Sequence, residues 1–461
     1  MKEGLRLTFR TLAWALLPGM ALTLGACARY HALPLGSRDI ARPLTAVEIS
    51  AGRISAPLLP AVRFQGGPLT PDQVALLAVA GNLRLRETRD RLRVAQAQVL
   101  IAGLLPNPTL GLGFSLPLGN TAGLSRGYSA GLGFDLGALL TRPLRRRVAR
   151  TAEQSVALSV AWQEWQVAEN AKLDALQLQS LTQAAGLARR LSHHAQRQSK
   201  RLVAALASHD ISLVDVDAAR ASATSTRLAW LRLEMHAAKL RARLDEALGL
   251  APGTVVPLAD CGRGDPWAQV PPVAHLLRYL AHRRPDLLAL RYGYHSANAA
   301  LREAIWGQFP DIAVTLTRAR DTTDVNTISP GVSVSLPIFN HSQGAIALAR
   351  ASRRELFDAY RARVFEARAD VLRLDQDLSD IERRIRLARK NTTIQGELAL
   401  VARRSFRRGD LGAISFYATQ SRATVSALEL LRLERVRNVI GVALEVASGR
   451  YFESPVQRVQ G

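Results

Sequence analysis

The segment Gly127-Tyr128-Ser129-Ala130-Gly131 matches the Gly-x-Ser-x-Gly pattern around the nucleophilic serine of many esterases. That chemistry needs the serine on a sharp turn between a strand and a helix. Here Ser129 lies inside an alternating pattern that continues through Leu136, and the chain lacks the alternating βαβ units of such enzymes. We therefore predict no catalytic residues and no enzyme activity, and we disfavour the alternative of a secreted serine hydrolase that uses Ser129.

Histidines are the next residues whose chemistry needs attention. His193 and His194 are adjacent, so on a helix they point about 100° apart and cannot converge on one ion. His275 and His282 are seven residues apart, and neither spacing is that of a standard metal pair. We predict neither a resident metal nor a cofactor.

Cys27 is a candidate for covalent modification. Residues 1–26 have a basic start and a short apolar stretch, Leu12 to Leu24, as in a secretory signal peptide. The segment Leu24-Gly25-Ala26-Cys27 resembles the bacterial lipobox, in which the cysteine is acylated and becomes the mature N-terminus. By the same resemblance, Ala28 after the cysteine implies the outer membrane. An ordinary signal peptide with a chance cysteine is the alternative.

Composition excludes several classes of protein. Of 461 residues 48% are hydrophobic, which is too many for a disordered chain. Two cysteines exclude a disulfide scaffold, and after residue 26 no uncharged apolar run of 18 residues indicates a transmembrane helix. The net charge is +23, but only five of the 61 basic residues are lysines, and acids accompany the arginines at helical spacing, as in Glu382 and Arg386. This pattern indicates solvated helix faces and not a nucleic-acid site.

The chain has the same plan twice. Residues 27–71, rich in proline and glycine, are expected to form an extended, lipid-anchored tether. Pro106 and Pro310 are 204 residues apart, whereas Leu136 and Leu336 are 200 apart, as are Gly249 and Gly449. We predict two tandem repeats. The boundaries are 72–250 for repeat 1, 251–284 for a linker, 285–449 for repeat 2 and 450–461 for a C-terminal tail.

Each repeat begins with a helix, near 72–104 and near 285–307, and continues with a strand pair, 109–136 in repeat 1 and 312–338 in repeat 2. Apolar residues there alternate with small or polar ones, which gives each strand one apolar face. Strands of nine or ten residues can cross a bilayer when tilted. Four such strands cannot close a barrel, and open edges are not tolerated in lipid. If these strands span a membrane, several chains must share one barrel.

A very long helix pair follows each strand pair. Residues 144–206 contain no proline, so a helix of about 90 Å is expected there, and 344–407 repeat the pattern. The helices break at Ser208-His209-Asp210 and at Arg408-Gly409-Asp410, and return helices run to Gly249 and Gly449.

The duplicated plan, the lipobox and the segment Arg284-Pro285-Asp286-Leu287 together resemble the TolC family of outer-membrane efflux proteins. The resemblance covers about residues 70–449. It implies an α+β membrane protein in which three chains form a twelve-stranded β-barrel above a long periplasmic α-helical barrel. The implied partners are two further copies of the chain, outer-membrane lipid, a periplasmic adaptor protein and an inner-membrane pump, without nucleic acid.

In the family the helix breaks form a constriction at the periplasmic end, partly lined by acids. Carried over to this chain, the gate candidates are Asp210, Asp215, Asp217 and Asp410. Ser415 and Tyr417 stand where a second acidic pair would be, so a cation gate is open to question. The aspartates at 210 and 410 could instead cap the return helices. Candidates for adaptor contact at the tips are His209, Arg407, Arg408 and Gly409.

We therefore expect a passive exit duct of a tripartite efflux pump, anchored in the bacterial outer membrane with its helical body in the periplasm. The segment Leu105-Pro106-Asn107-Pro108 resembles metal-exporting members, but drugs and other small molecules stay open as substrates. A periplasmic coiled-coil scaffold lipoprotein without a pore is the main alternative. The apolar strand faces argue against it, because a scaffold has no use for them.

Overall fold

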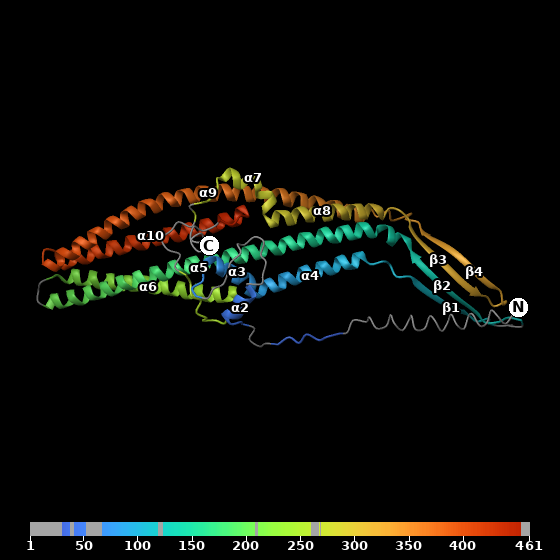
Figure 1. Ribbon diagram of the computed structural model, residues 1–461, viewed down its shortest axis with the longest axis horizontal. Helices are drawn as coiled ribbons and strands as arrows, with labels where there is room; N and C mark the ends of the chain where they lie inside the picture. The colour runs from blue at the N-terminus through green and yellow to red at the C-terminus, as the bar shows by residue number, and fades with distance from the viewer. Residues whose placement is uncertain are drawn as a thin grey trace. The chain divides into compact units, whose positions relative to one another are not determined.

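The computed structural model describes residues 30–36, 41–51, 67–118, 123–207, 211–259, 267 and 269–452. The chain divides into two compact units, Met1–Ala41 and Arg42–Gly461. The described residues of the first unit form neither helix nor strand. Every described helix and strand lies in the second unit (Figure 1).

The second unit is mainly helical, with one four-stranded sheet, as predicted. Its first half contains α2 (Leu44–Ala51), α3 (Pro71–Gly81), α4 (Leu83–Gly103), β1 (Thr109–Ser115), β2 (Gly127–Asp135), α5 (Leu136–Ala207) and α6 (Leu213–Leu248). Its second half contains α7 (Val273–Arg283), α8 (Pro285–Trp306), β3 (Asp311–Arg320), β4 (Asn326–Ser335), α9 (Gln343–Arg408) and α10 (Ala413–Ser448). From α3 onward, the same order of elements occurs twice.

Some boundaries differ from those expected. The helix expected over 72–104 is broken at Asn82, whose side chain accepts a hydrogen bond from the backbone of Leu85 and so caps α4. Helix α5 begins at Leu136 and not at residue 144, because the chain passes directly from β2 into a helix that continues through Pro143. Proline lacks only one N–H group, and packing along a 72-residue helix outweighs that loss. The expected tether contains the eight-residue helix α2, and the expected linker 251–284 contains α7.

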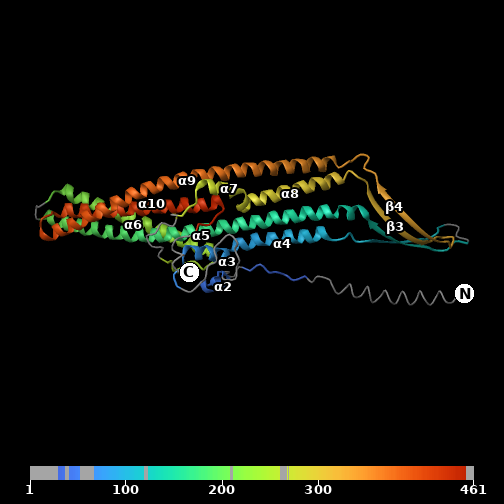
Figure 2. The same ribbon diagram turned by 45° about the horizontal axis from the view of Figure 1, so that its top comes forward.

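The long helices pack as two hairpins, α5 with α6 and α9 with α10, and α10 also contacts α5. The shorter helices α4 and α8 lie along α5, and α8 also contacts α9 (Figure 2). The buried face of α9 shows why it packs this way. Its apolar residues recur every three or four positions and form one stripe: Ala367, Val371, Leu374, Leu378, Ile381 and Ile385.

The sheet is antiparallel, with the order β1-β2-β3-β4. The register places the apolar residues of neighbouring strands opposite one another, and likewise the small or polar residues. Leu110, Leu132 and Leu316 form one cross-strand row, whereas the neighbouring row contains Gly131 and Thr317. One face of the sheet is therefore apolar and the other carries glycine and hydroxyl side chains.

Candidate functional site

The apolar face of the sheet is exposed in this chain. Leu112, Phe114 and Val332 have exposed fractions of 67%, 83% and 70%. Within the described residues β1 and β4 are edge strands, each bonded to a neighbour on one side only. None of the described helices is both long and apolar enough to span a bilayer. The sheet therefore presents two unpaired edges and an uncovered apolar surface.

Ser129 lies in the middle of β2, opposite Gly113 of β1 and Ala319 of β3. A nucleophile elbow needs the serine on a turn that leads into a helix. The strand continues for six residues beyond Ser129 before α5 begins. The esterase pattern in the sequence is thus part of a paired strand and lacks the setting that the chemistry requires.

The first hairpin tip is organised by Ser212. This residue is the N-cap of α6, and its hydroxyl oxygen accepts a hydrogen bond from the backbone N–H of Asp215. The Ser212 hydroxyl also donates to a carboxylate oxygen of Asp215 over 2.7 Å. Asp217 forms an ion pair with Arg220 at 3.2 Å. Both aspartates are exposed, and the charge of Asp217 is offset by its neighbour.

The second tip is organised by Gly409, the C-cap of α9, with a φ of 86° that glycine adopts without steric cost. Asp410 accepts from Nε of Arg408 at 2.8 Å, so these two charges offset each other. Arg407 is exposed beside them. Among the tip candidates, His209 and Asp210 lie outside the described residues, as does the lipidation candidate Cys27.

The alternative that Asp410 caps α10 is wrong, because the N-cap is Gly412 and has no side chain to bond with. Ser212 occupies the corresponding position before α6 and is the N-cap of that helix. A serine two residues after the aspartate competes for the role because its hydroxyl reaches the N–H at the third helical position. Asp410 is thus not the cap of α10.

The two hairpins are joined near their tips by Arg201 of α5 and Tyr417 of α10. Nη1 of Arg201 donates to the tyrosine hydroxyl over 2.6 Å. Tyr417 is 7% exposed and packs against Phe416, while Phe416 stacks on Phe406 of α9 with ring centres 4.5 Å apart. This aromatic cluster holds the second tip together and gives the first hairpin a polar attachment to it.

A buried charged cluster lies further along the hairpins. Nζ of Lys172 on α5 is 2.7 Å from Oε2 of Glu445 on α10 and 3.4 Å from Oδ1 of Asp72 on α3. Glu169, one turn before Lys172, is 1% exposed. The ring of Tyr451 lies 4.2 Å from the lysine ammonium. The cluster connects the first half of the unit to the segment after α10.

The charges in this cluster are unequal, since one lysine faces three carboxyl groups. Burial, and then the charge of Glu445, raise the pKa of Glu169 well above its ordinary value. Burial alone would lower the pKa of Lys172, but the charges of Glu445, Glu169 and Asp72 raise it. Burial also raises the pKa of Glu445, but the charge and hydrogen bond of Lys172 act against that rise. Protonation that reduces the negative charge of the cluster is therefore favoured first at Glu169.

Neither the Arg201–Tyr417 contact nor the Lys172 cluster was anticipated from the sequence. The sequence pattern could have predicted that Lys172 is buried, because this residue lies on the same helical stripe as Ala168 and Ala175, which are buried. A charged residue on such a stripe requires partners. The partners themselves, from α3 and α10, are 100 and 273 residues away and have no signature in the sequence.

The histidines are dispersed. His193 packs against Trp230, whereas His275 packs against Tyr279. Within the described part of the chain, no three side chains of histidine, cysteine, aspartate or glutamate come together in a way that could hold a metal ion.

The comparisons with known proteins agree with this geometry. Residues 276–450 match the family model described as outer membrane efflux protein. A comparison with curated proteins finds no match. The family match begins within α7 and continues through α8, β3, β4 and the hairpin of α9 and α10.

Solved structures extend the likeness to most of the chain. CusC, whose structures concern folding and transmembrane channel formation, is 18% identical with a TM-score of 0.69, covering 86% of this chain and 98% of its own. The outer membrane protein VceC of Vibrio cholerae is 15% identical with a TM-score of 0.67, covering 83% and 97%. The CmeC outer membrane channel of Campylobacter jejuni is 14% identical with a TM-score of 0.69, covering 94% and 98%. The chain therefore has the fold of these solved membrane proteins, and its residues 276–450 are similar to the outer membrane efflux protein family.

Proposed function

We propose that this protein is the outer-membrane exit duct of a tripartite efflux pump and acts as a passive conduit without chemistry of its own. The observation that carries the proposal is the sheet, which has an exposed apolar face and two unpaired edges within the described residues. Lipid accepts the apolar face but not the edges. Three copies, each contributing four strands, would join β1 of one chain to β4 of the next in a closed barrel of twelve.

The hairpins supply the rest of the duct. Helices α5 and α9 continue from the sheet, at residues 136 and 343, and end at the tips near residues 207 and 408. In a trimer, six hairpins would surround one channel and bring three copies of each tip together. The exposed Arg407, Arg408 and Gly409, with His209 of the first tip, would then face a periplasmic adaptor protein, and the adaptor would connect the duct to an inner-membrane pump.

The location follows from the same proposal. The sheet would lie in the bacterial outer membrane and the hairpins in the periplasm, with acyl chains on Cys27 as a second anchor. The transported substrate is a small molecule or a metal ion, and specificity would reside mainly in the pump.

Two measurements test the proposal. Native mass spectrometry of the detergent-extracted protein should give a trimer, and the trimer should conduct ions when inserted into a planar lipid bilayer. A folded monomer with an ordered sheet would refute the shared barrel. A stable trimer without conductance would favour the scaffold alternative.

A further inference from the structure

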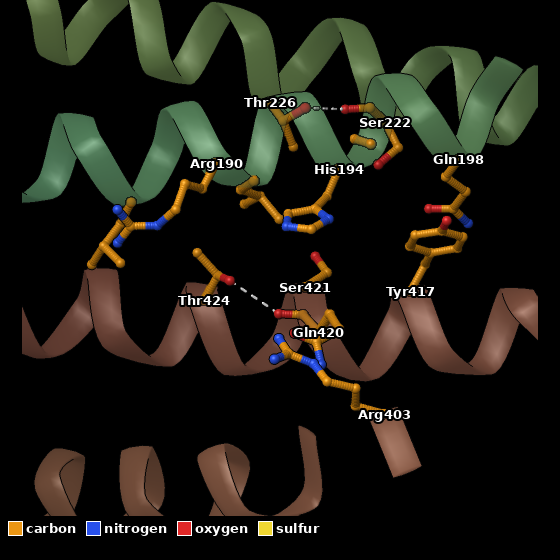
Figure 3. Close-up of a pocket in the computed structure, with 13 residues that line it drawn as sticks. Arg190, His194, Gln198, Ser222, Thr226, Arg403, Tyr417, Gln420, Ser421 and Thr424 are labelled. Carbon is orange, nitrogen blue, oxygen red and sulfur yellow. Dashed lines mark hydrogen bonds between the residues drawn. The ribbon is translucent and has the colours of Figure 1, made fainter. Parts of the chain in front are cut away.

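A pocket lies between the two hairpins, some way from the tips (Figure 3). All four long helices line it. Its ionisable lining is basic: Arg190 and His194 come from α5, and Arg403 comes from α9. No aspartate or glutamate occurs among the described residues that line it. The pocket therefore has a positive field that no lining carboxylate offsets.

Arg190 and Arg403 differ from other arginines of the hairpins in their ion pairing. Arg220 is paired with Asp217, and Arg408 is paired with Asp410. In the part of the chain that the structure describes, no ion pair joins Arg190 or Arg403 to a carboxylate. Guanidinium groups bind oxyanions through parallel N–H donors, so these two are available to an anion from solution.

His194 is one of the residues that line the pocket. Figure 3 shows its ring pointing from α5 into the pocket, towards Ser421 of α10. Nη2 of Arg197 lies 3.1 Å from Nδ1 of His194. Because arginine can only donate, Nδ1 accepts, and the neutral ring carries its proton on Nε2. That nitrogen is a donor in either protonation state.

Neutral donors complete the lining. The hydroxyl groups of Ser222 and Ser421 make no hydrogen bond within the described residues. Tyr417 accepts from Arg201, which leaves its own hydroxyl proton available to donate. The pocket thus offers charged and neutral donors and no carboxylate acceptor.

We propose that this pocket binds a small tetrahedral oxyanion, such as sulfate or phosphate, between His194 of α5 and Arg403 of α9. The anion would accept hydrogen bonds from both hairpins and so connect them. The hydrogen bond between Arg201 and Tyr417 already joins the hairpins beside this pocket. Arg190 would add to the field from the α5 side. This role is separate from conduction and does not depend on it.

Binding should be coupled to protonation. The charged and titratable groups around His194 are Arg197, which lies 3.1 Å from its ring, and His193 and Arg403, which act on it electrostatically. Arg190 and Tyr417 line the same pocket. Burial, and then the charges of Arg197 and Arg403 together with His193, lower the pKa of His194 below its ordinary value. A bound oxyanion reverses this effect and raises that pKa. The anion is therefore bound more tightly as the pH falls, by a factor of ten for each unit by which binding raises the pKa.

Sulfate is the appropriate probe, because it stays doubly charged across the range in which histidine titrates. Calorimetric titration of the full-length protein in detergent, with chloride holding the ionic strength constant, should show saturable binding at about pH 5.5. Binding at about pH 8 should be at least tenfold weaker. Arg403→Gln should weaken binding at least tenfold at both pH values. Arg404→Gln, one residue further along α9 and outside the lining, is the matched control and should bind as the wild type does.

His194→Gln keeps a donor but cannot titrate, so its sulfate affinity should be the same at both pH values. If the wild-type protein shows no saturable sulfate binding, or if Arg403→Gln binds as tightly as the wild type, the site does not exist. A pH dependence that persists in His194→Gln would overturn the assignment of the proton to this residue. Each variant should keep the oligomeric state of the wild type, which native mass spectrometry reports.

Discussion

Arg201 of α5 donates a hydrogen bond of 2.6 Å to the hydroxyl oxygen of Tyr417 on α10, and this contact ties the first hairpin to the second near their tips. Tyr417 is buried whereas Arg201 is exposed, so the bond is partly buried. In the proposed duct both tips lie at the end of the hairpins that is remote from the sheet. The hydrogen bond from Arg201 therefore helps to fix the position of the first tip relative to the aromatic cluster of Phe406, Phe416 and Tyr417.

Tyr417→Phe should loosen the tips without unfolding the chain. The substitution keeps the ring and its packing on Phe416 but removes the acceptor of Arg201, a loss of about 1 kcal/mol. Hydrogen exchange followed by mass spectrometry should show severalfold faster exchange in peptides around residues 411–420. Tyr294→Phe is the matched control, since the Tyr294 hydroxyl makes no hydrogen bond in the described chain. Unchanged exchange at the tip would show that packing alone holds the hairpins together.

The fold was largely predictable because its signals are local and periodic. The alternation in 109–136 and 312–338 specifies strand faces, and the spacing of apolar residues in 344–407 specifies the buried stripe of α9. The duplication made each signal visible twice. Boundaries were less predictable: Pro143 suggested a helix start at 144, whereas the connection from β2 begins α5 at Leu136.

The candidate site was less predictable because its contacts are long-range. Asp410 could have been a helix cap by type and position, yet Gly412 lies at the N-cap, since one residue more or less in the turn changes which side chain reaches the free N–H groups. The partners of Lys172 and Arg201 lie on other helices and become adjacent only when the two halves of the chain pack together. Such contacts depend on helix rotation and register, which no local pattern encodes.

Glu169→Gln should stabilise the protein at neutral and higher pH. The pKa of Glu169 is raised above 4.5 by burial and by Glu445, so the folded state holds a proton that the unfolded chain releases above that pH. Its contribution to stability is therefore complete below about pH 4.5 and declines as the pH rises towards the folded pKa. Glutamine resembles the protonated acid at every pH, so the variant should lose this decline. Thermal unfolding of the two proteins between about pH 5 and pH 8 measures it.

The control for that experiment is Glu153→Gln, on the same helix and outside the cluster, which should leave the pH profile unchanged. Lys172→Met serves as the opposite test, because it leaves three carboxyl groups without their cation and should cost about 3–5 kcal/mol. If Glu169→Gln destabilises the protein as Lys172→Met does, Glu169 is ionised in the folded state and the assignment of the proton is wrong.

Cys27→Ser should abolish acylation and leave the precursor uncleaved by the lipoprotein signal peptidase. The expectation depends on the sequence Leu24-Gly25-Ala26-Cys27, in which small residues precede the cysteine as in a lipobox. Mass spectrometry of the mature N-terminus of the wild-type protein is decisive. An acylated cysteine at residue 27 supports the anchor, whereas an unmodified terminus at another residue would exclude it.

Asp215→Ala with Asp217→Ala should reduce the cation selectivity of the channel in a planar bilayer. In a trimer three copies of the first tip form one ring, and both carboxylates are exposed there. Asp217 is offset by Arg220, so most of the change should come from Asp215, whose oxygen accepts only the neutral hydroxyl of Ser212.

Arg220→Ala should act in the opposite direction, since it leaves the charge of Asp217 uncompensated. Ser415→Ala, at the equivalent position of the second tip, should leave the reversal potential in a salt gradient unchanged. If neither the double variant nor Arg220→Ala shifts that potential in a properly formed trimer, these aspartates do not line the conducting path, and their role is limited to the first turn of α6.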